Sequence, residues 1–94
     1  MQELVVGQVV RSAAGRDKGH FMVIVDVLDE EYVMLCDGRK RKVASPKKKK
    51  VKHLRKTNTV FFEVCEKLDR GLLTDAEIRK KIADCFGGKR GEEG

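Results

Sequence analysis

Residues 4–28 read LVVGQVVRSAAGRDKGHFMVIVDVL, and this segment predicts two β-strands joined by a basic loop. The two flanks, 4–11 and 21–28, are short and rich in β-branched or apolar side chains, which favour extended structure. The second flank is apolar on nearly both faces. Between the flanks, Gly15 and Gly19 can adopt the positive φ angles that a tight loop needs. The segment therefore predicts a strand–loop–strand unit.

Further short strands are predicted after this unit. Residues 32–36 form an apolar strand, and the Asp-Gly pair at 37–38 is a strong hairpin signal. Residues 39–44 carry cations on both faces and therefore suit only an edge strand, which Pro46 ends. Residues 50–54 mix polar and apolar side chains and are a candidate for a short last strand. Four or five strands at this spacing predict a small β-barrel or sandwich.

The last third of the chain predicts a helical hairpin. The first helix has apolar residues at helical spacing, with N-cap candidates at 57–59 and Gly71 after its end. Its apolar positions are Val60, Phe61, Val64, Cys65 and Leu68.

The second helix begins with a capping box at 74–77, continues with an apolar stripe and stops at the glycine pair 87–88, before a frayed tail. The stripe consists of Ile78, Ile82 and Phe86. Two helices this short need a surface for their apolar faces, which is either the β domain or another molecule.

Length and composition exclude several classes of protein. A chain of 94 residues buries only roughly 60–65% of its unfolded surface, and this thin core argues against a deep catalytic pocket. No apolar run approaches the ~18 residues of a membrane span, and we expect no signal peptide. No nucleophile–base pair or phosphate-binding glycine loop is recognisable. The sequence thus predicts a non-enzymatic cytoplasmic protein without a small-molecule substrate.

The number and spacing of the cysteines also indicate a reducing compartment such as the cytoplasm. Cys36, Cys65 and Cys85 are odd in number and widely spaced, which fits reduced thiols that fill small core positions. They and the two histidines lack the close spacing of a zinc site. We therefore expect neither a metal nor another cofactor.

Positive charge is concentrated in one part of the chain. Residues 1–59 contain 14 Lys and Arg against 7 Asp and Glu, whereas residues 60–94 contain 7 against 8. Residues 39–56 include 11 basic side chains and no acidic one. A field of one sign at this density indicates a polyanionic partner.

Three groups of residues then stand in a characteristic order, namely Gly7-Gln8-Val9-Val10, Ala14-Gly15-Arg16-Asp17-Lys18-Gly19-His20 and Val23-Ile24-Val25-Asp26. This series resembles the KOW motif, a β–loop–β unit of ribosomal proteins and transcription elongation factors. Gly19 matches the family's glycine, and Arg16 and Lys18 match its basic loop positions.

The resemblance extends over residues 4–56. Segments 29–35, 39–43 and 52–54 are similar to the KOW domain of archaeal and eukaryotic large-subunit ribosomal proteins, the group that includes the fourteen-e, six-e and twenty-seven-e families. Short stand-alone bacterial KOW proteins look similar as well. The resemblance implies an SH3-like β-barrel and contact with RNA. We expect this domain, with its basic arm, at 1–56, and the helical pattern described above predicts an extension at 57–94 that departs from the ribosomal proteins.

The candidate RNA-binding residues are the cations of the loop and of the basic region. Lysines of the run at 47–50 are expected to form a flexible arm that binds phosphate without reading sequence. Exposed aromatics are scarce, and Phe21 and Tyr32 are expected in the core, so we expect recognition of RNA shape and backbone. His53 can stack on a base or donate to a phosphate. The full set is Arg16, Lys18, Arg39, Lys40, Arg41, Lys42, Lys47, Lys48, Lys49, Lys50, Lys52, His53, Arg55 and Lys56.

Ribosomal RNA is the first partner that the resemblance implies, with ribosomal proteins or RNA polymerase as further partners. One alternative is a protein-interaction module whose basic face binds an acidic surface of a transcription or translation factor. A weaker alternative is a subunit of a nucleic-acid enzyme. Phosphate contacts alone do not distinguish RNA from DNA.

Overall fold

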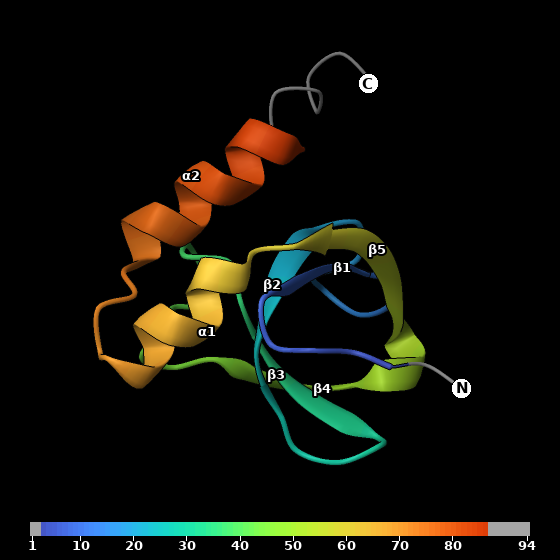
Figure 1. The fold of residues 1–94 in the computed structure, drawn as a ribbon. Coiled ribbons are helices and arrows are strands. Elements are labelled where there is room, and N and C mark those ends of the chain that lie inside the picture. Colours follow the sequence, from blue (N-terminus) through green and yellow to red (C-terminus); the bar gives the residue numbers. More distant parts are fainter. Residues whose placement is uncertain (1–2, 87–94) are drawn as a thin grey trace.

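The computed structural model describes residues 3–86, which form a curled antiparallel sheet and two helices (Figure 1). The sheet order is β4-β3-β2-β1-β5, so β4 and β5 are its outer strands. The described residues show no pairing between these two strands, so the predicted closed barrel is not confirmed. The predicted class, mainly β with a helical C-terminal part, is confirmed. The strands are β1 (Gln8–Ser12), β2 (Phe21–Val27), β3 (Tyr32–Cys36), β4 (Lys47–Lys50) and β5 (Leu54–Val60).

The sheet curls around an apolar interior. Register shifts lie between Gln8 and Val10 and between Ile24 and Asp26, and such bulges bend a strand and increase its twist. A short 3₁₀ turn, η1 (Val51–His53), connects the two outer strands. The interior core draws on four of the five strands and consists of Val10, Met22, Ile24, Val33, Leu35 and Leu54.

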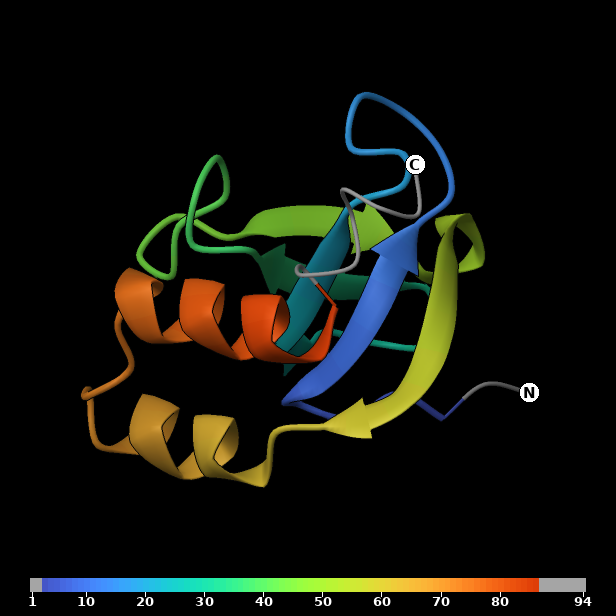
Figure 2. The same cartoon turned by 90° about the horizontal axis from the view of Figure 1, so that it is seen from above.

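The other face of the sheet is covered by α1 (Phe62–Asp69) and α2 (Asp75–Cys85), which lie together on one side of it (Figure 2). Val64 and Ile78 are fully buried there, against Val9, Val23 and Cys36. The helical hairpin therefore docks on the protein's own sheet. Both cores draw on alternate residues of β2, which explains why that strand is apolar on both faces.

The second helix begins as its sequence predicts. The side chain of Thr74 accepts a hydrogen bond from the amide of Glu77 at 3.2 Å, which is the capping contact. Gly71 follows the first helix with a φ of 68°, as expected of a residue just beyond a helix end. The expected stop at 87–88 and the tail lie outside the described residues.

The predicted start of the first helix is wrong. Residues 57–59 belong to β5, and α1 begins only at Phe62, without a side-chain cap. Threonine caps helices but is also β-branched, and here Thr57 donates its hydroxyl to the carbonyl of Val9 at 2.8 Å within the sheet. The expected division of the chain at 56/57 falls inside this strand. Residues 51–53, part of the candidate last strand, are η1.

The positions of the edge strand and of the basic arm are corrected together. Residues 39–44 form no strand but a turn, in which Asp37 accepts hydrogen bonds from the amides of Arg39 and Arg41. The edge strand is instead β4, the lysine run itself, which pairs with β3. The prediction of a flexible arm is therefore wrong. Backbone pairing with an apolar strand orders lysines that have no apolar pattern of their own.

Of the three cysteines, only Cys36 is a core residue; Cys65 and Cys85 are exposed on the helices. Their helices turn other residues, Val64 and Ile78, towards the sheet. No helix among residues 3–86 is long and apolar enough to cross a membrane.

Candidate nucleic-acid interface

The loop at 13–20 is ordered by its own main chain. Gly19 donates its amide to the carbonyl of Ser12 at 2.7 Å, and Ser12 donates to that of His20 at 3.0 Å. Ala13 donates to the carbonyl of His53 at 2.8 Å, which attaches the loop to η1. Arg16 and Lys18 are exposed on this loop. The loop thus presents its two predicted cations from a fixed frame.

The turn at 37–46 and this loop project from the same end of the strands of the sheet (Figure 2). Arg41 of the turn forms an ion pair with Asp17 of the loop, with 3.5 Å between Nη2 and Oδ2. The Asp17 side chain is only 5% exposed, so this pair is shielded from solvent on the acidic side. Arg41, a predicted RNA ligand, is therefore engaged within the protein.

A second predicted ligand also has an internal partner. Lys49 is 9% exposed and lies opposite Val33, on the interior side of the curled sheet. Its Nζ donates a hydrogen bond to the carbonyl oxygen of Ala14 at 3.1 Å. This contact connects outer strand β4 to the loop that follows β1.

The neighbouring lysines point to the opposite face. Lys48 and Lys50 are exposed, and their Nζ atoms lie 4.5 and 5.9 Å from the centroid of the Tyr32 ring. Tyr32 is half-buried beneath them on β3, rather than in the core as expected. Cation–π attraction orients the two ammonium groups on this outer face. The lysine run therefore presents alternate charges from a rigid strand.

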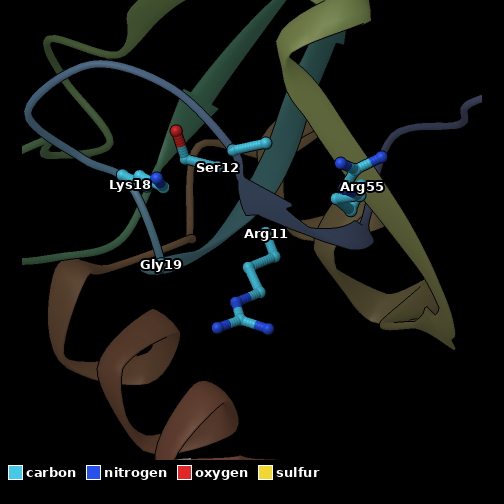
Figure 3. Close-up of a pocket in the computed structure, with 6 residues that line it drawn as sticks. Arg11, Ser12, Lys18, Gly19 and Arg55 are labelled. Atoms are coloured by element: carbon cyan, nitrogen blue, oxygen red, sulfur yellow. The ribbon is translucent and has the colours of Figure 1, made fainter.

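A shallow depression of about 690 Å³ lies where β1, β5 and the loop meet (Figure 3). Three cations surround it: Arg11 on β1 stands between Lys18 and Arg55 (Figure 3). Arg11 was not among the residues predicted from the sequence. Its charge directly after the apolar pair Val9 and Val10 was a visible signal, but its alignment with Arg55 depends on pairing between distant segments.

The other predicted ligands are placed on four segments. Arg39, Lys40 and Lys42 are exposed on the turn at 37–46, which α2 also contacts through Arg79 and Asp75. Lys47 at the start of β4 and His53 in η1 are half-buried, whereas Lys52 and Lys56 are exposed. The structure therefore spreads the cations over the loop, the turn, β4, η1 and β5.

A metal site needs several His, Cys, Asp or Glu side chains that lie close together. Among residues 3–86, no group of three or more His, Cys, Asp or Glu side chains lies close enough to hold a metal ion. The arrangement offers positive charges on ordered backbone, which suits binding to phosphates.

No family model matches this chain. The chain is 27% identical over 84 residues to the large ribosomal subunit protein eL14 of Desulfurococcus amylolyticus and, equally, to that of Staphylothermus marinus. The match covers 89% of this chain and 81% of each relative. It is too long to be confined to residues 4–56, so it includes part of the helical region. The chain is therefore similar over most of its length to archaeal proteins of the large ribosomal subunit.

Proposed function

We propose that this chain is a non-enzymatic, KOW-type RNA-binding protein of the cytoplasm that associates with the ribosome. Its partner is ribosomal or other structured RNA, which it contacts through backbone phosphates. The observation that carries the proposal is the set of exposed cations on ordered segments, with the loop at 13–20 and the turn at 37–46 joined by the Arg41–Asp17 pair. The similarity to eL14 proteins supports the ribosomal setting. In this proposal the KOW-type part extends to the end of β5.

The proposal divides the predicted ligands into two groups by their contacts. Arg41 and Lys49 hold the loop in place through Asp17 and Ala14, and they act on RNA only by positioning. The others contact phosphate directly, with His53 beside them as a stacking or donor group. The direct contacts are Arg16, Lys18, Arg39, Lys40, Lys42, Lys47, Lys48, Lys50, Lys52, Arg55 and Lys56.

The expected mode is recognition of shape and backbone. Lysine ammonium groups act as point charges, and the described surface offers few aromatic platforms for single-stranded bases. These cations lie on several segments of the surface, and a bound RNA that engages five or six of them at one time predicts that log K falls with log salt concentration with a slope of roughly −4 to −5.

Fluorescence anisotropy with a labelled structured RNA over a series of salt concentrations tests the proposal. The expected result is tight binding at low salt and a slope in that range. Binding that is absent at low salt, or that does not change with salt, would contradict it. A duplex DNA of the same sequence serves as the comparison, and equal binding to both would limit the proposal to nucleic acids in general.

A further inference from the structure

Arg11 and Arg55 lie directly opposite one another in the antiparallel pair of β1 and β5. Directly opposite residues have Cβ atoms about 4.5–5.5 Å apart, and like charges in such positions destabilise the sheet. Both arginines are exposed, and neither takes part in an ion pair within residues 3–86. A bound anion between them would remove this repulsion.

Arg11 is supported from its other side. Phe21 on β2 is its second cross-strand neighbour, and the guanidinium carbon lies 5.8 Å from the centroid of that ring. Phe21 itself stacks on Phe86, just after α2, with the ring centroids 4.2 Å apart and an interplanar angle of 15°. The helical part therefore contributes to the position of Arg11.

The third cation comes from the loop. Lys18 and Gly19 form the loop side of the same depression, and Arg55 forms the opposite side (Figure 3). The side chain of Arg11 extends from the strand towards the helical part in this structure, with its guanidinium near Phe21 (Figure 3). Side chains of this length can turn towards a shared ligand without movement of the backbone.

We propose that this depression is a phosphate subsite, in which one phosphodiester group of the bound RNA lies between Arg11 and Arg55, with Lys18 as a third contact. The inference deepens the proposed function and rests on it. Guanidinium groups match phosphate oxygens with two parallel N–H donors, and a single negative charge offsets the repulsion between the arginines. Ser12, the one other polar side chain of the lining, donates its hydroxyl to Ala14 at 3.0 Å. The subsite therefore fixes the position of the RNA backbone and reads no base.

The test compares Arg11→Gln and Arg55→Gln with Arg70→Gln, an equal loss of charge on an exposed arginine after α1. RNA affinity is measured against salt for all three variants. The proposal predicts that each subsite variant lowers the RNA affinity and removes part of the ~0.7–0.9 that one phosphate contact adds to the magnitude of the log–log slope, while Arg70→Gln leaves both unchanged. Thermal unfolding at low salt provides the second readout. Arg55→Gln should be as stable as the parent protein or more stable, because it removes the like-charge pair and leaves the contact of Arg11 with Phe21 in place, whereas a purely structural arginine would destabilise the fold when replaced.

The outcomes separate the two proposals. If the parent protein binds RNA and both subsite variants retain its slope, the subsite is wrong and RNA binding stands. If the parent protein binds no RNA, the proposed function fails, and NMR titration with inorganic phosphate still decides the subsite. Shifts of the Arg11 and Arg55 Nε–H signals that saturate would then support an anion site, and unchanged signals would overturn it.

Discussion

The ammonium group of Lys49 donates a hydrogen bond to the main-chain carbonyl of Ala14 at 3.1 Å, and this contact links an outer strand to the loop after a central strand. It explains the direction of every side chain in the lysine run. With Lys49 turned to the interior, Lys48 and Lys50 must point to the opposite face of β4, above Tyr32. A run of identical residues therefore presents its side chains to two different environments.

Replacing Lys49 with Met should destabilise the protein by about 1–3 kcal/mol, because it removes a charge-assisted hydrogen bond and leaves the hydroxyl of Ser12 as the donor to the carbonyl of Ala14. The matched variant Lys48→Met removes the same charge from an exposed position and should cost less than about 1 kcal/mol. Chemical unfolding measures both values. Equal losses of stability would show that the contact with Ala14 has no structural role.

The order of the two variants should be reversed for RNA binding, with the larger effect from Lys48→Met. Lys48→Met should lower the magnitude of the salt slope by ~0.7–0.9, since it removes one direct phosphate contact. Lys49→Met should leave the slope within error of the parent value at a temperature where the variant is fully folded. A larger change for Lys49 than for Lys48 would assign the buried lysine to the RNA.

The ion pair between Asp17 and Arg41 should couple the loop to the turn. Removing one partner of a fully buried ion pair lowers the free energy of unfolding by about 3–5 kcal/mol. The Arg41 side chain is 31% exposed, so we expect a smaller loss of about 1–3 kcal/mol for Asp17→Asn. The cycle with Arg41→Gln isolates the pair, with an expected coupling of about 0.5–3 kcal/mol. If the loss of stability in the double variant equals the sum of the losses in the two single variants, this role is contradicted.

Cys36 should resist thiol reagents in the folded protein. Its burial, together with the charges of Asp75 and Asp37, raises the pKa of its thiol to about 12. The thiolate is the reactive form, so at pH 8 only the exposed Cys65 and Cys85 should react with a disulfide reagent until denaturant is added. Three thiols reacting at one rate would contradict the buried position of Cys36.

The same thiol predicts a loss of stability in alkaline solution. Above pH 9 the unfolded thiol ionises whereas the folded one stays neutral to about pH 12, so the unfolded state binds fewer protons. Stability should therefore fall as pH rises through this range, by about 1.4 kcal/mol per pH unit from this group. Cys36→Ala should remove this part of the decline, and an unchanged decline would assign it to other groups.

Gly38 should be the more sensitive of two comparable glycines. It has a φ of 79°, and an added Cβ would lie 2.5 Å from the carbonyl oxygen of Asp75 at the start of α2. Gly19 has a φ of 88° with no atom within 4 Å of that position. Both alanine variants carry backbone strain, of order 1–3 kcal/mol. Only Gly38→Ala should also loosen α2, and the amides of α2 should then exchange their hydrogens faster. Equal exchange rates in both variants would show that the close approach to Asp75 does not affect α2.

The elements predicted most closely from sequence are those specified by local patterns. The strands β2 and β3 have continuous apolar runs, and α2 carries its own start signal in Thr74 and Glu77. The lysine run has no such pattern, and its strand depends on pairing with β3. Residues 57–59 were ambiguous because threonine suits both a helix start and a strand. Pairing with β1 stabilises these residues as part of strand β5.

The candidate site divides in the same way. Arg16 and Lys18 were predicted because the loop between two strands resembles the KOW motif, and the structure places both of them exposed on that loop. Neither the engagement of Arg41 by Asp17 nor the alignment of Arg11 with Arg55 follows from local sequence, because each joins segments distant in the chain. Charge density indicates a polyanionic partner, but it does not show which cations are exposed and which are engaged by other groups of the protein.

Sedimentation of native cell lysate through sucrose gradients, while this protein is followed, tests the ribosomal assignment most directly. The account predicts that the protein migrates with the large ribosomal subunit at low salt and that RNase treatment releases it. Persistence at high salt would indicate an integral position, and release at high salt a peripheral one held by the exposed cations. Migration only in the light fractions at low salt, or a partner that stays bound after RNase, would contradict the account.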